Sequence, residues 1–183
     1  MASVLVPLAQ GCEELEAVTI IDLLRRAGIE VTTAGLDNQP IRASRGVVLI
    51  PDTTLDEALN RDYDMVVLPG GLPGADHLDQ DARIQTLLKQ MSRNDKFIAA
   101  ICAAPKVLAS AGLLDNKRAT AYPGTLEKLN LQKTTLASEP VVKDGKVITS
   151  RGPGTAMDFA LTLIETLLSD EKRKEVEVGL VRP

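Results

Sequence analysis

The 183-residue sequence has no tryptophan, only two tyrosines and two phenylalanines, and a single histidine. Because aromatic residues make up 2% of the chain and hydrophobic residues 44%, its core must be built from Val, Leu, Ile and Ala. Aliphatic cores of this kind are typical of parallel sheets that carry helices on their faces. The sequence also lacks a basic stripe and has a net charge of −4, which argues against nucleic acid as a partner.

The features of a secreted or membrane protein are missing as well. The N-terminus, MASVLVPLAQ, has no basic segment, and no apolar run approaches the length that crosses a membrane. Two cysteines, Cys12 and Cys102, are 90 residues apart and do not make a disulfide framework. No linker or repeat divides the chain. We therefore expect one cytoplasmic domain that spans residues 1–183 and has no membrane partner.

Short apolar runs alternate with helical patterns along the chain. Strands are predicted at residues 3–8, 30–34, 64–68 and 97–101, and helices at residues 13–27, 82–93, 103–111 and 155–168. Thr54-x-x-Glu57 fits a capping box, and Asp144-Gly145 in VVKDGKVITS marks a hairpin turn. This order predicts an α/β fold, a flavodoxin-like three-layer sandwich with a mainly parallel central sheet.

In such a sheet, the functional crevice lies outside the carboxyl ends of the parallel strands. The segments that follow the predicted strands are residues 9–16, 69–76, 102–104 and 150–155. Three of them are rich in glycine or alanine, and the fourth carries three carboxylates and Cys12. One edge of the sheet is therefore expected to collect a thiol, acids and closely approaching backbone, which is more than packing requires.

Cys102 lies in KFIAAICAAPKVLASAG, where a buried strand leads into a helix. At such a turn the following amides point at the side chain, so they favour a thiolate and can hold an oxyanion or an oxidised sulfur. The small neighbours Ala100, Ala103 and Ala104 allow a sharp turn of the kind found in nucleophile elbows. The alternative is a packed, unreactive thiol, because free cysteine is among the most buried residue types.

Three acids, Glu13, Glu14 and Glu16, begin the first predicted helix, where a solvated first turn is the default for all of them. Glu16 falls on an apolar stripe of this helix and Glu13 on a neighbouring one, so periodicity alone does not choose which carboxyl points inward. A carboxyl buried beside a thiolate would have a raised pKa. It could then donate a hydrogen bond to sulfur or carry a proton.

Gly70-Gly71 follows the predicted strand DMVVLP, and it either places an amide near the thiol or marks an ordinary turn. No Gly-Lys-Ser/Thr follows, so this segment is not a phosphate loop. We expect neither a cofactor nor a metal.

His77 lies between Asp76 and Asp79, but we interpret HLDQDAR as a polar approach to a helix, with a surface histidine rather than a triad member. Cys12 has two interpretations. It is either a resolving thiol for an oxidised Cys102 or a small residue in a tight turn.

Four motifs, GCEELEAV, VVLPGG, AAICAAP and TSRGPGTAMDFAL, follow one another over nearly the whole chain. In these motifs the sequence resembles the ThiJ/PfpI superfamily, and most closely its small single-domain branch. The resemblance implies that Cys102 is the reactive, oxidation-prone cysteine and that Glu16, rather than Glu13, is its partner acid. The amides of Gly71 and Ala103 would form an oxyanion site. Further residues would line or support the pocket, partly across a dimer: Gly70, Arg26, Arg45, Tyr122, Ser150, Arg151, Gly152 and Pro153.

The resemblance also implies a function and a partner. We expect a homodimer that acts in carbonyl and oxidative stress, with deglycase or glyoxalase-type activity on methylglyoxal or its adducts, such as glycated protein side chains. The alternative is a non-enzymatic redox-sensing chaperone, in which Cys102 oxidises to sulfinate and the dimer binds unfolded clients. Both functions need a stabilised thiolate at Cys102, so the sequence does not separate them.

Two positions depart from the wider pattern of the superfamily. Amidotransferase and protease relatives have a histidine directly after the cysteine, where this chain has Ala103, so a Cys-His-acid triad is not expected. Relatives with the clearest glyoxalase assignment have a histidine where this chain has Tyr122. Because a phenol with a reference pKa of about 10 is a poor base at neutral pH, proton transfer would rely on Glu16.

Overall fold

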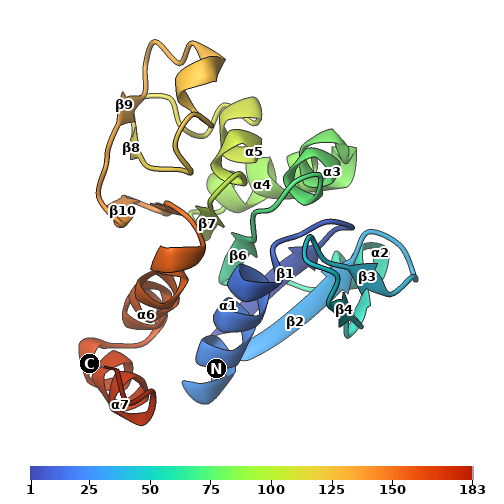
Figure 1. Ribbon diagram of the computed structural model, residues 1–183, viewed down its shortest axis with the longest axis vertical. Helices are drawn as coiled ribbons and strands as arrows, with labels where there is room; N and C mark the ends of the chain where they lie inside the picture. The colour runs from blue at the N-terminus through green and yellow to red at the C-terminus, as the bar shows by residue number, and fades with distance from the viewer. Residues whose placement is uncertain (183) are drawn as a thin grey trace.

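The computed structural model describes residues 1–182, and a seven-stranded sheet runs through its middle (Figure 1). The strands lie in the order β10-β11-β7-β6-β1-β2-β5, and all neighbours are parallel except β10 and β11. The strands of this sheet are β1 (Ser3–Leu8), β2 (Glu30–Gly35), β5 (Thr53–Thr54), β6 (Met65–Leu68), β7 (Phe97–Ile101), β10 (Val141–Asp144) and β11 (Val147–Ser150).

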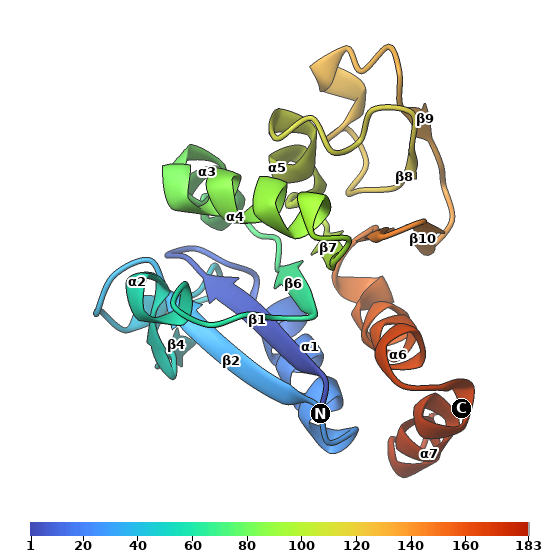
Figure 2. The same ribbon diagram turned by 180° about the vertical axis from the view of Figure 1, so that it is seen from behind.

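Helices cover both faces of the sheet, which gives three layers (Figures 1 and 2). The α-helices are α1 (Glu14–Arg26), α2 (Leu55–Ala58), α3 (Gly74–Gln80), α4 (Ala82–Arg93), α5 (Pro105–Ser110), α6 (Ala156–Leu167) and α7 (Asp170–Gly179). Two short pairs of strands lie outside the main sheet: β3 (Ile41–Arg42) with β4 (Val48–Leu49), and β8 (Arg118–Ala119) with β9 (Thr135–Leu136).

Alternation along the strands divides the core into two clusters. In β1, Val4 and Val6 point to the face covered by α1 and α6, whereas Leu5 points to the face covered by α2, α3, α4 and α5. The same alternation separates Val67 from Val66 in β6. Because side chains on a strand alternate between its faces, strands with both faces buried need continuous apolar runs. The predicted three-layer sandwich is therefore confirmed, and its aliphatic core explains the scarcity of aromatic residues.

The order of the strands fixes where ligands can bind. The parallel strands β2, β1, β6, β7 and β11 have the flavodoxin-like order 2-1-3-4-5, in which the chain reverses direction between β1 and β6. The crevice at such a switch point opens outside the carboxyl ends of the strands. The turns after β1, β6 and β7 meet there.

Two local predictions differ from the structure. The segment HLDQDAR, residues 77–83, is predicted to be a polar approach to a helix, but its first four residues belong to the separate helix α3. The apolar periodicity of α3 is hidden because only Ala75 and Leu78 among its side-chain-bearing residues are buried. The helix after Cys102 begins at Pro105 rather than at residue 103. The hairpin turn at Asp144-Gly145 and the cap of α2, where the Thr54 hydroxyl accepts from the Glu57 amide, are confirmed.

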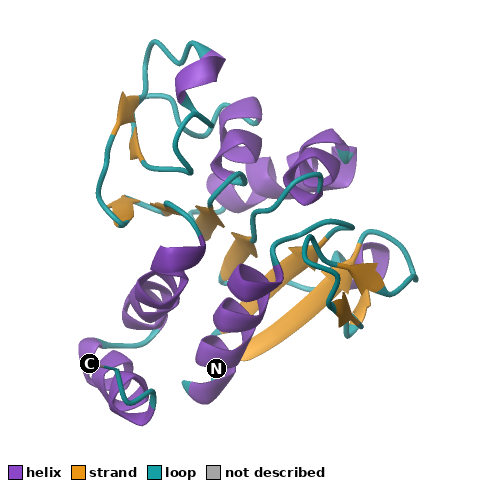
Figure 3. Cartoon of the chain, viewed as in Figure 1, coloured by secondary structure: helices purple, strands orange, loops and turns teal. Residues whose placement is uncertain are grey.

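The segment between α5 and β10, residues 111–140, consists mainly of loop with β8, β9 and one short 3-10 turn (Figure 3). Tyr122 lies in this loop. Within residues 1–182, no helix combines the length and the apolar character that a membrane crossing requires.

Candidate active site

Cys102 occupies the turn that directly follows β7, and its backbone has a φ of 65°. This left-handed conformation is uncommon for a residue with a side chain and is characteristic of strained functional turns. Two backbone hydrogen bonds hold Cys102 in this conformation. The Cys102 amide donates to Ser150 O at 3.0 Å, and the Cys102 carbonyl accepts from the Tyr122 amide at 2.9 Å. The Cys102 side chain is 9% exposed. The backbone therefore has the geometry of a nucleophile elbow.

Gly70 lies against Cys102 and Gly71 against the turn after β1, and neither position can hold another residue without displacement. A Cβ on Gly70 would lie 2.6 Å from Cys102 Cβ and 2.8 Å from Glu16 Oε2. Gly71 has a φ of 89°, and a Cβ there would lie 2.3 Å from the Glu13 nitrogen. Both positions therefore need glycine because neighbouring atoms leave no room for a Cβ, and Gly71 also needs it for its positive φ.

Glu16 is the carboxyl that faces the thiol. Its side chain is fully buried, and its Oε2 accepts a hydrogen bond from the Gly70 amide at 2.8 Å. Its Oε1 has no nitrogen or oxygen partner in the described part of the chain. Glu13 instead accepts from the Ser44 hydroxyl at 2.8 Å. The apolar stripe of α1 that contains Glu16 therefore faces the thiol, whereas Glu13 points to Ser44.

Glu16 and Cys102 form a coupled pair of acids. Burial raises the pKa of Glu16 to about 7, although its contacts with Cys102 and the Gly70 amide oppose that rise. Burial raises the pKa of the Cys102 thiol to about 12, with the charge of Glu16 and a hydrogen bond to it adding to the effect. Between these two values the pair holds a single proton.

The thiolate is less favoured than the sequence implied. The amides of Gly71 and Ala103 do lower the pKa of Cys102, but burial and the neighbouring carboxylate outweigh them. The expected help from a helix is small, because α5 has six residues and begins three positions after Cys102. A thiolate forms here when the proton moves from Sγ to Glu16, so the pair, and not the thiol alone, is the reactive unit.

Glu14 is a structural carboxylate that the sequence prediction missed. Its side chain is 8% exposed rather than solvated, and its oxygens accept from the Arg45 amide at 2.9 and 3.1 Å and from the Ser44 hydroxyl at 3.1 Å. Partial burial would raise its pKa, but these bonds and those from its own amide and from Val47 lower it. Glu14 therefore holds the turn that carries Arg45 against the start of α1.

Two further predicted site residues, Tyr122 and Ser150, belong to the segments whose backbone bonds the Cys102 turn. Tyr122 packs on Gly152, where a Cβ would lie 3.3 Å from Tyr122 Cδ2, and its side chain is 52% exposed. The Ser150 hydroxyl donates to Pro140 O at 2.7 Å and shares a hydrogen bond with Thr155. Thr155 also accepts from the Gly152 amide at 3.1 Å. The only sequence signal for this role of Thr155 is its place at the end of the SRGPGT motif, residues 150–155.

Within the described residues, none of the three predicted arginines has a side-chain hydrogen bond or ion pair with Cys102 or Glu16. Arg26 ends α1, about 15 Å along the helix from Glu16, and pairs with Asp22 at 2.8 Å. Because Glu16 and Arg26 lie at opposite ends of one helix, Arg26 does not line the site around Glu16 within one chain. Its predicted supporting role, partly across a dimer, stays a prediction. Arg151 bonds Ser138 O at 3.3 Å, and the Arg45 side chain is exposed. Pro153 begins the short turn before α6.

Cys12 and His77 lie outside the thiol–carboxyl pair. Cys12 is a free cysteine, 1% exposed, and burial together with the charges of Glu14 and Glu13 raises the pKa of its thiol to about 12. Because Cys12 is almost completely buried in the turn after β1, its position favours the interpretation as a small residue in a tight turn. His77 is exposed on α3, and no group of three His, Cys, Asp or Glu side chains within residues 1–182 could hold a metal ion.

The chain is similar to proteins of one family over nearly its whole length. The model of the DJ-1/PfpI family matches residues 2–166. Protein dj-1beta of Drosophila melanogaster is 45% identical over 180 residues, which cover 98% of this chain and 96% of that protein. The crystal structure of Drosophila melanogaster DJ-1beta has a TM-score of 0.95 and covers 100% of this chain and 98% of its own, at 43% identity.

Two further relatives bear on chemistry through their names. The structure described as "Toxoplasma gondii DJ-1, oxidized" has a TM-score of 0.94 at 40% identity and covers 99% of this chain and 98% of its own. A Caenorhabditis elegans protein named glutathione-independent glyoxalase DJR-1.2 is 36% identical over 171 residues, which cover 93% of this chain and 90% of that protein.

Proposed function

The chain belongs to the DJ-1/PfpI family, and from this membership and the geometry around Cys102 we propose that it is a cysteine-dependent enzyme for reactive carbonyls. Its substrates are methylglyoxal-type aldehydes or their early adducts on protein side chains, and its activity is of the glyoxalase or deglycase type. It acts in the cytoplasm, where a reducing environment keeps both cysteines as thiols. The glyoxalase name of the Caenorhabditis elegans relative supports this class of substrate.

One observation carries the proposal: the buried Glu16 carboxyl, one oxygen of which has no hydrogen-bond partner within the described residues, lies beside the buried Cys102 thiol. Glu16 Oε1 is that oxygen, and the hydrogen bond to Gly70 occupies Oε2 and holds the carboxyl in place. A group with a pKa of about 7 can both take and return a proton at neutral pH, which is the requirement for a general acid–base. A merely packed thiol would need no such partner.

The reaction begins with addition. Cys102 Sγ attacks the aldehyde carbon of methylglyoxal while its proton passes to Glu16 Oε1. The developing oxyanion receives hydrogen bonds from the amides of Gly71 and Ala103, and the lowering of the Cys102 pKa by these two amides supports this role. Glu16 then gives the proton to this oxygen, and a hemithioacetal results.

The second stage is an internal oxidation and reduction. Glu16 removes the proton from the former aldehyde carbon and gives it to the ketone oxygen, which forms an enediol. Glu16 then takes the hydroxyl proton from the former aldehyde oxygen and delivers it to the neighbouring carbon. One carbon is thereby oxidised to a thioester and the other is reduced to an alcohol, with no external oxidant. Water hydrolyses the thioester, which releases lactate and restores the thiol.

Tyr122 takes no proton in this scheme. Its ring packs on Gly152 beside the turn that holds Cys102, and its amide bonds the Cys102 carbonyl. The phenol serves as a hydrogen-bond donor at the mouth of the site. Proton transfer rests on Glu16 alone.

The protein acts as a homodimer in this proposal. Apolar side chains that are about half exposed or more gather on α1 and on the segment around β4: Leu15, Val18, Val47, Val48 and Ile50. Exposed apolar patches of this kind mark protein–protein interfaces. The Arg45 turn adjoins this surface, so a second copy would receive Arg45 near its own site.

A second candidate function is redox sensing coupled to chaperone activity. The oxidized structure of the Toxoplasma gondii relative favours it. Two equivalents of peroxide would convert the Cys102 thiol to a sulfinate with release of two waters, and the Gly71 and Ala103 amides would bind the new oxygens. Protonated Glu16 would donate the remaining hydrogen bond. Intact mass after mild peroxide treatment tests this candidate, because two added oxygens must be confined to Cys102 and not appear equally at Cys12.

The deciding experiment measures methylglyoxal consumption and lactate formation in the wild type, Cys102→Ala and Cys12→Ala. Any thiol traps an aldehyde once, so the criterion is lactate well in excess of enzyme. We expect many turnovers in the wild type and Cys12→Ala and none in Cys102→Ala. Aldehyde loss limited to one equivalent without lactate would contradict the enzyme and leave the sensor.

A further inference from the structure

A second cavity, of about 380 Å³, opens at the same edge of the sheet as Cys102 but beside β1 and β2. Its polar wall consists of side chains from the turn after β1, the turn after β2 and the end of α3: Gln10, Asp37, His77, Gln80 and Asp81. Pockets of 300–1,000 Å³ outside the carboxyl ends of parallel strands are common ligand sites in α/β proteins. Nothing in the proposed carbonyl chemistry uses this cavity.

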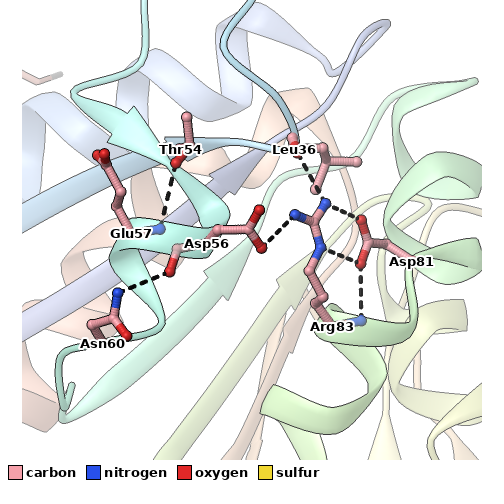
Figure 4. Close-up of polar contacts among 7 residues, drawn as sticks. All are labelled: Leu36, Thr54, Asp56, Glu57, Asn60, Asp81 and Arg83. Atoms are coloured by element: carbon pink, nitrogen blue, oxygen red, sulfur yellow. Dashed lines mark hydrogen bonds and ion pairs between the residues drawn. The ribbon is translucent and has the colours of Figure 1, made fainter.

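One side of the cavity is clamped by Arg83 (Figure 4). Its guanidinium donates to Asp81 at 2.6 and 3.0 Å, to Asp56 of α2 at 2.8 Å and to Leu36 O at 2.9 Å. Leu36 and Asp81 both line the cavity. Because one rigid guanidinium fork joins α2, the end of β2 and the start of α4, this wall is held in place without any ligand.

The opposite side is clamped by Gln10. Its amide nitrogen donates to Pro40 O at 2.8 Å, and its amide oxygen accepts from the Arg42 amide at 2.9 Å. Both hydrogen-bonding ends of Gln10 are thus occupied by the backbone on either side of Ile41, which also lines the cavity. The cavity is therefore preformed on both sides, which reduces the entropy lost on binding.

Three polar groups remain for a ligand. His77 and Gln80 are three positions apart on α3 and lie on one face of it, and neither side chain has a hydrogen-bond partner among residues 1–182. Asp37 uses Oδ1 to accept from the Gln39 amide at 2.8 Å, which leaves Oδ2 free. The neighbouring acids Asp76 and Asp79 are engaged elsewhere, with Lys106 and Gln85.

The charge of the lining selects the kind of ligand. Arg83 neutralises Asp81, whereas no ion pair within the described residues involves Asp37. We propose that this cavity is a second ligand site that binds a small molecule bearing a guanidinium or amine group. Asp37 Oδ2 pairs with the cation, and the His77 imidazole and the Gln80 amide bind its remaining polar atoms. The aliphatic stem of the ligand lies on Leu36 and Ile41.

The experiment titrates the 15N-labelled full chain with n-butylguanidine and, separately, with n-butylurea, which has the same shape but no charge. The guanidinium probe should shift the backbone amides around the cavity and saturate, with weaker binding at high salt because the pair is exposed. The neutral probe should bind clearly more weakly. Equal binding of the two probes, or shifts confined to other parts of the surface, would overturn the proposal.

Matched variants locate the charge. Asp37→Asn keeps the oxygen that caps the Gln39 amide but loses the charge, so binding should weaken by about threefold to fivefold, as expected for an exposed ion pair. Asp115→Asn removes an exposed carboxylate away from the cavity and should change nothing. Unchanged binding in Asp37→Asn would contradict the proposal. Alkylation of Cys102 should be the same in both variants, so this test succeeds or fails independently of the carbonyl chemistry.

Discussion

Glu14 and Glu16 lie two residues apart in the first turn of α1, yet the protein holds their carboxyls in opposite ways. Glu14 accepts from two backbone amides of the Arg45 turn and from the Ser44 hydroxyl, and the pKa of its carboxyl is lowered. Glu16 accepts from one amide, that of Gly70, and burial raises the pKa of its carboxyl to about 7.

Both side chains are buried, at 8% and 0% exposure, so burial alone does not explain the difference. The depth of each carboxyl below the surface and the number of donors that point at it together do, because Glu16 is completely enclosed with one backbone donor and Glu14 lies near the surface with several. A carboxylate with several donors is a permanent anion that fixes backbone, whereas one with a single donor and a thiol beside it can exchange a proton. One helical turn therefore contains a structural acid and a chemical acid.

Substitution of Glu16 and of Glu14 should differ most in its effect on the turnover rate. Glu16→Gln should lower lactate formation by about 100-fold or more, because an amide cannot take the thiol proton. Glu14→Gln should keep most of the activity, since its carboxyl does not face the sulfur. Steady-state rates with methylglyoxal measure both. Equal losses in the two variants would mean that the turn as a whole, and not the proton carrier, supports catalysis.

The two acids should also affect stability with opposite signs. Glu16 has a folded-state pKa above its unfolded value, so its contribution to the free energy of unfolding is present below about pH 4.5 and is lost as pH rises to about 7. At pH 8, Glu16→Gln should therefore be more stable than the wild type by up to about 3 kcal/mol.

Glu14 has a lowered pKa, so its contribution is present at neutral pH and is lost as pH falls. Glu14→Gln should be less stable at pH 7 by about 1–3 kcal/mol, because its new NH₂ group faces backbone donors. Urea unfolding of both variants at pH 5 and pH 8 tests the signs. A Glu16→Gln variant that is less stable than the wild type at pH 8 would show that the buried anion is better compensated than its contacts indicate.

The pH profile of Cys102 alkylation sharpens the comparison further. In the wild type and in Glu14→Gln, the rate with iodoacetamide should rise as pH increases through about 7, because Glu16 then loses its proton and can accept that of the thiol. Glu16→Gln should lack this inflection. Mass spectrometry confirms the site of alkylation, and Cys102→Ala supplies the background from Cys12. An inflection near 7 that persists in Glu16→Gln would assign it to another group.

The smallest effect is expected at Tyr122. Its side chain is half exposed and outside the thiol–carboxyl pair, so Tyr122→Phe should change the turnover rate by no more than about threefold, as for the loss of one exposed hydrogen bond. Tyr122→Leu is the matched control, because it also removes the ring that packs on Gly152. A loss in Tyr122→Phe as large as that in Glu16→Gln would make the phenol a catalytic group.

Local sequence patterns predicted much of the fold. Continuous apolar runs predicted the buried strands, and the Asp144-Gly145 turn and the Thr54 cap appear where their residues indicated. The same patterns failed for α3, because a short helix with two buried side chains has no visible periodicity. The roles assigned to Cys102 and Glu16 stay predictions until the variants are measured.

Several features depended on contacts between distant segments. Glu14 was expected to be solvated because its partners, Ser44 and Arg45, are 30 and 31 residues away. The clamp formed by Arg83 joins segments up to 47 residues apart. Periodicity could not choose between Glu13 and Glu16, because the choice depends on which stripe faces the Gly70 turn.

The sequence by itself determined the layers of the fold, the class of core side chain and the position of a cysteine at a strand-to-helix turn. These follow from short-range chemistry: side-chain periodicity, turn residues and helix caps act within a few positions of one another. Only the tertiary structure decided which carboxyl keeps its proton near neutral pH and which cavity is preformed. A pKa and a cavity depend on the burial and the donors that distant segments supply, and those are settled when the chain packs.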